Sequence, residues 1–217
     1  MEIGFEMAAT LTQALLSAKK SSDLNRAGLF FALAGIEFIL GVSALQALYP
    51  NYSVHSNALS NMAAIGAPTA IPATLVAIIS DLCWLFGAYF LFRNTGKRAL
   101  LVVYSIPPLA FLLPALSPEN FIPIIHFVGG AVHDIVGAAV AILTFWIVKS
   151  PFRYFSIALG LLTAAGIVIL FRGYYTPLVQ MTLGPGGWEE IYQYSLEIWL
   201  IGLGSALLGF GRSVRQD

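Results

Sequence analysis

The chain has 217 residues, of which 58% are hydrophobic and only 10% are charged. A soluble domain normally contains about a quarter charged residues, so this chain has too few charges to cover a water-facing surface. Its formal net charge is zero, which argues against the basic surface that nucleic-acid binding requires. Cys83 is the single cysteine, so no disulfide can form within the chain. We therefore expect a membrane protein that is surrounded by lipids and has no nucleic-acid partner.

Six apolar runs approach the ~20 residues that a helix needs to cross about 30 Å of hydrocarbon. They occupy residues 28–48, 71–92, 99–116, 122–148, 152–171 and 191–211. Pro107 and Pro108 fall inside the third run, where a membrane bundle tolerates them as kinks. The sequence predicts an all-α integral membrane bundle of six transmembrane helices over residues 28–211. Residues 1–27 form a cytoplasmic N-terminal segment in this prediction, and residues 212–217 form a cytoplasmic tail.

The segment before the first run has a helical pattern of its own. Ile3, Met7, Leu11 and Leu15 recur at a spacing of four residues. This spacing favours a short amphipathic helix on the cytoplasmic surface of the membrane, and a frayed tail is the alternative.

The basic residues are distributed unevenly along the chain. If both ends are cytoplasmic, ten of the eleven Lys and Arg residues fall on the cytoplasmic side of the six runs, and Arg172 alone falls outside. This distribution follows the positive-inside rule. It predicts a multi-pass protein of the cell membrane with a cytoplasmic N-terminus and a cytoplasmic C-terminus.

Several ionisable residues interrupt the apolar runs. They are Glu37, Asp81, His133, Asp134 and Glu197, with His126 nearer the outer end of the fourth run. A charge at the centre of a membrane helix costs roughly 2.5–3.5 kcal/mol, so such residues normally face the bundle interior. Small residues flank them at helical spacing, as Gly130 and Gly137 do on the fourth run, which predicts packing faces. Either these side chains share one site, or each is neutralised by its own neighbour.

The depth of these residues indicates which side a shared site would face. The cytoplasmic half of every run is nearly free of titratable groups. We predict an outward-facing polar site above a hydrophobic floor, with a core of Glu37, Asp81, His126, His133 and Asp134. The mouth of this site would consist of Arg172, Glu189, Glu197, Tyr194 and His55.

The residue types leave the chemistry of the site open among a lipid headgroup, a small solute and protons, and they do not decide whether the protein is an enzyme. His126, His133, Asp134 and Asp81 are usable zinc ligands. However, seven residues of helix separate the two histidines by about 10.5 Å, which fits poorly with Zn–N bonds of about 2 Å. No sequence motif predicts a cofactor. Two alternatives stay open: an accessory subunit that binds a membrane-protein partner or a second copy, and an outer-leaflet lipid hydrolase that uses a metal.

Two segments carry a family resemblance. Residues 48–53 and 57–61 follow the first run, and residues 186–190 precede the last run, with Tyr194 and Trp199 further on. Together they resemble a prokaryotic six-helix membrane family known as domain of unknown function 998. The resemblance covers about residues 28–211 and implies the six-span order, without an established activity. The chain departs from the family at Asn61, Glu190 and Ser195, where the family has aspartate, arginine and proline.

Overall fold

The computed structural model describes residues 2–171, 173 and 176–213, with the backbone alone for residues 2–20 and 210–213. The long helices are α1 (Glu2–Leu48), α2 (Ala70–Thr95), α3 (Arg98–Leu116), α4 (Pro123–Leu143), α5 (Phe152–Phe171) and α7 (Gly184–Ser213). Three short helices accompany them: η1 (Leu59–Ala63), η2 (Thr144–Trp146) and α6 (Pro177–Gln180). The described part of the chain contains no strand, so the predicted all-α fold is confirmed there.

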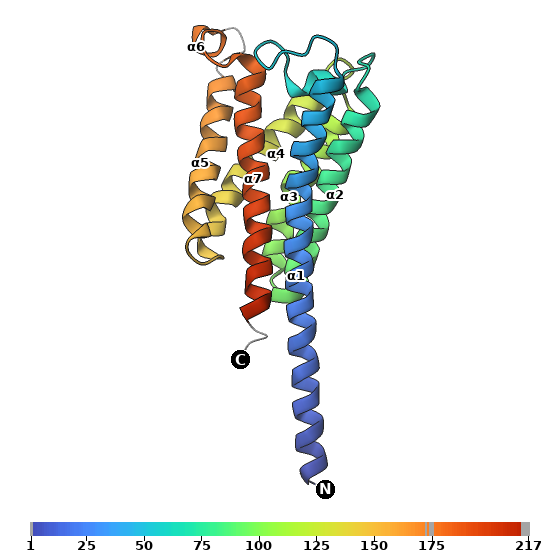
Figure 1. Cartoon of the computed structure of the whole chain (residues 1–217), viewed down its shortest axis with the longest axis vertical. Helices are drawn as coiled ribbons and strands as arrows, with labels where there is room; N and C mark the ends of the chain where they lie inside the picture. Colours follow the sequence, from blue (N-terminus) through green and yellow to red (C-terminus); the bar gives the residue numbers. More distant parts are fainter. Residues whose placement is uncertain (1, 172, 174–175, 214–217) are drawn as a thin grey trace.

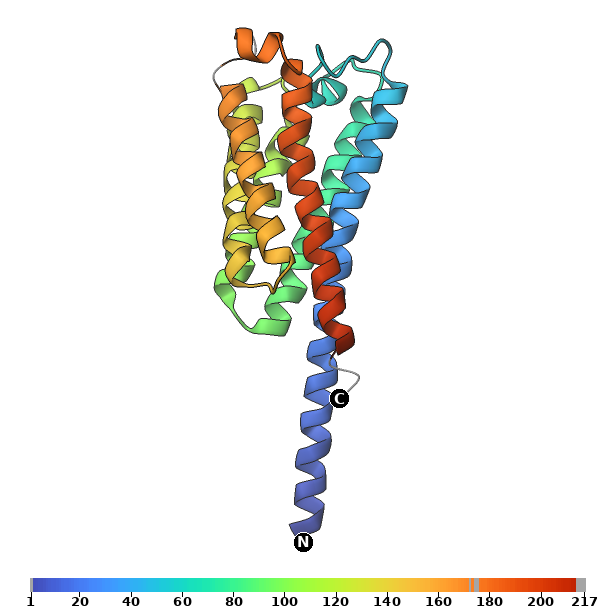
Figure 2. The same ribbon diagram turned by 60° about the vertical axis from the view of Figure 1, so that its left-hand side comes forward.

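The helix ends agree closely with the apolar runs. Each of the six runs lies within one long helix, except that the fourth run passes from α4 into η2. The sequence did not predict η1 and α6. Helix α1 continues without a break from Glu2 through the first run, and Figures 1 and 2 show that its first part projects beyond the bundle. The expected position of residues 3–16 on the membrane surface stays a prediction.

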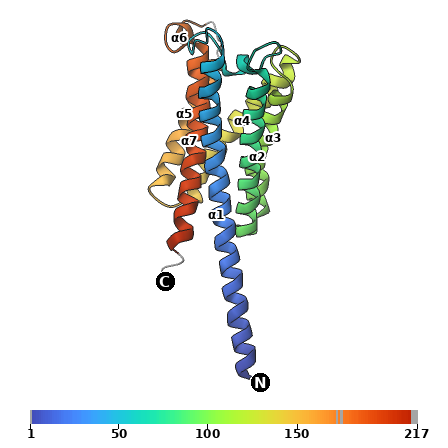
Figure 3. The same cartoon turned by 45° about the vertical axis from the view of Figure 1, so that its right-hand side comes forward.

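The six long helices form a closed ring. Each helix from α1 to α5 packs against the next one along the chain, and α7 packs against both α5 and α1. Figure 3 shows α7 beside α1, with α2 and α3 on the other side of α1. The start of α1 and the end of α7 lie at the same end of the bundle (Figure 1). We call this the inner end, and the end that carries η1 and α6 the outer end.

The outer surface of the ring is apolar. Side chains such as Leu40 on α1 and Ile71 on α2 are 65% and 77% exposed, which water would disfavour and a bilayer would cover. Five helices in the described residues are long and apolar enough to cross a membrane by length and composition, namely Ser21–Leu48, Ala70–Thr95, Arg98–Leu116, Pro123–Trp146 and Phe152–Phe171. The chain therefore forms a helical bundle suited to a membrane.

Helix α7 is more polar than α2, α3, α4 and α5, and its position explains why. Its side chains Gln193, Ser195 and Glu197 are all buried. Between residues 184 and 200 only Ile198 is exposed. Because α7 presents little surface to lipid, its sequence does not have to be as apolar as that of its neighbours.

The inner half of the ring is filled by large aromatic side chains. Trp84, Tyr104 and Trp199 are almost completely buried, and their ring centroids lie 5.8 Å (Trp84–Trp199) and 6.1 Å (Tyr104–Trp199) apart. Two of these side chains form hydrogen bonds with their polar atoms. Tyr104 pairs its hydroxyl with Thr144 at 2.6 Å, and Trp199 donates from Nε1 to Ser156 Oγ at 2.9 Å. This layer closes the bundle on its inner side.

Helices α1 and α7 approach each other through glycines. A Cβ atom at Gly35 would lie 2.3 Å from the carbonyl oxygen of Glu197, and one at Gly204 would lie 2.4 Å from the carbonyl oxygen of Gly28. These obstacles are backbone atoms, which cannot rotate away. Small residues that permit close backbone approach are typical of membrane helix interfaces.

We therefore expect Gly35→Ala to destabilise the bundle by about 1–3 kcal/mol, the usual cost of forcing extra atoms into a packed interior. The measurement is the midpoint of thermal unfolding in detergent micelles. Gly209→Ala is the matched control, because a Cβ there meets no atom within 4 Å and alanine is the better helix former. Equal midpoints for the two variants would contradict the close approach of α1 and α7.

Candidate functional site

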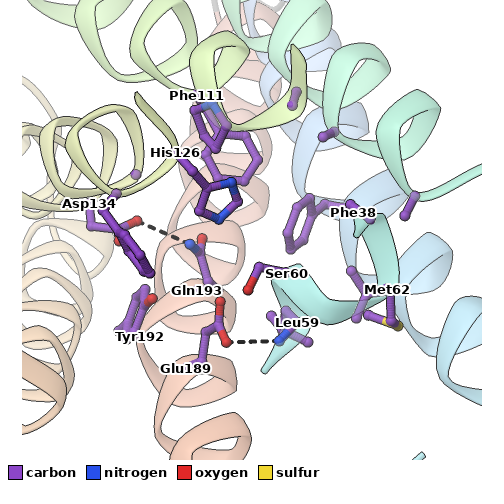
Figure 4. A pocket seen from close by; sticks show the side chains of 18 of the residues that line it. Phe38, Leu59, Ser60, Met62, Phe111, His126, Asp134, Glu189, Tyr192 and Gln193 are labelled. Carbon is purple, nitrogen blue, oxygen red and sulfur yellow. Dashed lines mark hydrogen bonds between the residues drawn. The ribbon is translucent and has the colours of Figure 1, made fainter. Parts of the chain in front are cut away.

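A cavity of about 190 Å³ lies inside the outer half of the ring. All six long helices and η1 contribute side chains to its lining, and Figure 4 shows these side chains converging on one space. An engineered apolar cavity of about 150 Å³ is large enough for benzene. The cavity can therefore hold one ring or a short chain together with a small polar group.

Most of the lining is apolar. Phe38 of α1, Met62 of η1 and Phe111 of α3 form one side of the cavity. Phe127 of α4 and Phe171 of α5 also line it, yet they are 53% and 64% exposed on the outside of the bundle. The cavity wall between α4 and α5 therefore borders the surface that lipid would cover.

The opposite side of the cavity has a polar edge, built by α4 and α7. Gln193 Nε2 donates a hydrogen bond to Asp134 Oδ1 at 3.0 Å, which joins the two helices (Figure 4). The other amide atom, Gln193 Oε1, is buried and has no hydrogen-bond partner among the described residues. A buried amide oxygen without a partner costs free energy on the order of 1–3 kcal/mol. The edge therefore keeps one unused acceptor.

His126 lines the cavity from the outer part of α4. Its Nδ1 lies 3.1 Å from the backbone carbonyl oxygen of Ser117. A carbonyl oxygen only accepts, so this geometry assigns the ring proton to Nδ1. The neutral imidazole then presents Nε2 as a second acceptor.

Glu189 fastens η1 over the outer side of the cavity. Its Oε2 accepts a hydrogen bond from the backbone N–H of Leu59 at 2.8 Å (Figure 4), and the backbone of Ser60 also donates to this carboxyl group. Glu189 precedes the sixth apolar run. Burial raises its pKa to about 7, while the two backbone hydrogen bonds oppose this shift and the nearby Glu119 and Glu190 add to it.

A second carboxyl group holds η1 from the turn between α3 and α4. Ser60 Oγ donates to Glu119 Oε2 at 2.7 Å, and Asn61 Nδ2 donates to Glu119 Oε1. Asn61 also accepts from the backbone N–H of Ala58 at 2.9 Å. An aspartate at position 61 could not donate to Glu119 and would repel it. In this chain the asparagine therefore suits the contact that holds η1 in place.

Four of the predicted site residues do not line the cavity: the buried Asp81, His133 and Glu197 and the partly buried Glu37. Asp81 and Glu197 are each 2% exposed, and each has one carboxyl oxygen with no partner among the described residues. Glu197 lies within electrostatic range of Glu37, Asp81 and Asp134. These groups do come together, but apart from the cavity.

His133 is separated from the cavity by packing. Its Nδ1 lies 3.1 Å from the carbonyl oxygen of Pro107. The ring of Phe111, which lines the cavity, packs on the imidazole with centroids 4.4 Å apart. His133 Nε2 lies 3.9 Å from Asp134 Oδ1, so Asp134 is the residue that touches both the cavity and the interior group.

The predicted mouth is only partly assembled. Glu189 lines the cavity, and Glu197 is buried deeper. His55 is exposed and lies with its Nε2 3.0 Å from the carbonyl oxygen of Gln180. Tyr194 is half-buried and does not line the cavity. Arg172 lies outside the described residues.

The structure does not bring together the residues that the sequence analysis named as usable zinc ligands. Within the described ranges, no three His, Cys, Asp or Glu side chains are grouped so that they could hold a metal ion. His126 lines the cavity, whereas His133 packs behind Phe111. The alternative of a metal-dependent hydrolase therefore finds no ligand set among the described residues.

Four polar lining residues were not part of the predicted site: Ser60, Thr74, Tyr192 and Gln193. Gln193 follows Glu189 by four residues and precedes Glu197 by four, so the three share one face of α7. That spacing could have identified Gln193. Ser60 had no comparable signal, because its place at the cavity depends on the fold of the loop into η1.

Comparisons with known proteins identify no family for this chain. It matches no protein-family model, no curated protein and no solved structure. The resemblance to domain of unknown function 998 stays a prediction.

The raised pKa of Glu189 makes stability depend on pH. Because the folded state holds a proton that the unfolded chain loses above the ordinary value of 4.5, the stabilisation is full below that value. It is lost as the pH rises towards 7. We expect the free energy of unfolding to fall over this interval by on the order of 2–3 kcal/mol. The midpoint of thermal unfolding should fall with it. Glu189→Gln should flatten the slope of midpoint against pH, and an unchanged slope would contradict the assignment.

Proposed function

We propose that the chain is a multi-pass membrane protein whose outer cavity binds a small amphiphilic molecule. The observation that carries this proposal is the composition of the lining. Apolar side chains from six helices surround one compact polar edge, formed by Asp134, Gln193, Glu189 and His126. Ligand pockets typically combine an apolar wall with a few convergent polar groups.

The position of the cavity favours supply from the outer leaflet. Phe127 and Phe171 line the cavity and also face the outside of the bundle. An amphiphile dissolved in the bilayer would meet these two side chains before it met the polar edge. The volume of about 190 Å³ limits the occupant to a small molecule or to one end of a larger lipid.

We also propose six crossings of the cell membrane, with both ends of the chain in the cytoplasm. Two observations support this arrangement. The start of α1 and the end of α7 lie at the inner end of the bundle (Figure 1), where the charge distribution predicts the cytoplasm. Helix α7, although more polar, is enclosed by its neighbours and runs alongside α1 and α5.

The orientation can be tested with cysteine labelling in a Cys83→Ser background. Ser56 and Ser150 are exposed residues at the outer and inner ends, and cysteine replaces serine with little change in shape. A membrane-impermeant maleimide should label Ser56→Cys in intact cells and should label Ser150→Cys only after lysis. The reverse pattern would contradict the proposed orientation.

Ligand binding can be tested by filling the cavity. Gly130 lines it, and a Cβ atom at this position meets no atom within 4 Å. We therefore expect Gly130→Leu to occupy the empty space without a clash at the backbone. The probes are 2-phenylethanol, phenethylamine and phenylacetate, which share one ring and differ in their polar group. Equilibrium dialysis of purified protein in nanodiscs should give saturable binding of at least one probe to the wild type, and about tenfold weaker binding or none to Gly130→Leu.

Gly209→Leu is the control for this variant, because Gly209 also has open space around a Cβ and lies far along α7. It should bind the probes like the wild type. The proposal fails if no probe binds the wild type saturably, or if Gly130→Leu binds as well as Gly209→Leu.

A further inference from the structure

The polar edge of the cavity consists mainly of hydrogen-bond acceptors. Gln193 uses its amide nitrogen on Asp134 and leaves Oε1 without a partner. His126 uses Nδ1 on the carbonyl of Ser117, so its neutral ring offers Nε2 as an acceptor. The hydroxyl of Ser60 is committed as a donor to Glu119. A ligand that satisfies this edge must therefore bring donors.

The unpaired oxygen of Gln193 is a second indication of a ligand, and it does not depend on the acidic residues. The Gln193 side chain is 4% exposed, and its amide group lies at the cavity in Figure 4, between Asp134 and His126. Asparagine and glutamine side chains that are buried normally satisfy both ends of the amide. The amide nitrogen of Gln193 is already bound to Asp134, so a donor in the cavity would satisfy the amide oxygen as well.

The ionisable side chains at the edge are acids, apart from His126. Asp134 and Glu189 line the cavity, and none of the described residues that line it is Lys or Arg. A phosphate or carboxylate group would meet two carboxyl groups here without a cation to balance them. An ammonium group has three donors and no acceptor, and charge-assisted hydrogen bonds to carboxylates are about twice as strong as neutral ones.

The apolar wall suits the same kind of ligand. Phe38, Phe111 and Tyr192 line the cavity. Aromatic rings attract a cation that lies within about 6 Å of the ring face. The same rings also pack against an apolar ligand body, so one wall serves both parts of an apolar amine.

We propose that the cavity selects a small apolar or aromatic amine, whose ammonium group is held by Asp134 and Gln193 in the field of Glu189. This inference rests on the proposed function and narrows it to one class of ligand. A neutral alcohol of the same size would fill the cavity but would supply one donor and no charge. An anion of the same size would be excluded.

The test compares phenethylamine, 2-phenylethanol and phenylacetate on the same nanodisc preparations by equilibrium dialysis at constant ionic strength. In the wild type we expect phenethylamine to bind about tenfold or more tightly than 2-phenylethanol, and phenylacetate to bind most weakly. The double variant Asp134→Asn with Glu189→Gln keeps the shape of both side chains. It should lower amine affinity to that of the alcohol, and saturable binding of 2-phenylethanol by this variant shows that it is folded.

Asp81→Asn is the matched control, since Asp81 is a buried acid that does not line the cavity. It should keep the preference for the amine. Equal or tighter binding of 2-phenylethanol by the wild type, or a full amine preference in the double variant, would overturn the amine proposal while the cavity remains a binding site. Absence of saturable binding for all three probes would instead remove the proposed function itself.

Discussion

The structure depends on the burial of one polar face of α7. Glu189, Gln193 and Glu197 follow one another at intervals of four residues and point into the ring. Lipid cannot satisfy such groups, so they have to face the other helices. The glycine contacts of Gly35 and Gly204 bring α7 close enough to α1 to close the ring around this face. Glu189 then holds η1, Gln193 joins α7 to Asp134, and Glu197 lies near the other interior acids.

The cavity exists because the outer half of the ring is built differently from the inner half. Trp84, Tyr104 and Trp199 fill the inner half with bulky rings. In the outer half Gly130 leaves open space in front of α4. The short helix η1 closes this space from outside, and the carboxyl groups of Glu189 and Glu119 hold it there. The loop that carries η1 is thus held by acceptors on α7 and on the turn between α3 and α4.

The sequence predicted the long helices well because span length and hydropathy are properties of single segments. It included His126 and Asp134 in the predicted site, since a polar residue beside small ones indicates an interior face, and it assigned Glu189 to the mouth from its depth. It could not separate these from Glu37, Asp81, His133 and Glu197, which have the same local pattern. What distinguishes the two groups is the packing of residues distant in sequence, such as Phe111 against His133.

Asp134 connects the residues that line the cavity with the predicted site residues that do not line it. Its carboxyl group takes the hydrogen bond of Gln193 at the cavity, lies 3.9 Å from His133 Nε2, and is within electrostatic range of Glu197. Interactions between charges are strong where the surroundings are apolar. A cation bound beside Asp134 would favour the charged form of that carboxyl group, and the interior acids would experience the change. Glu197 in turn interacts with Glu37 and Asp81, so an amine bound as proposed would also act on the charges at the centre of the bundle.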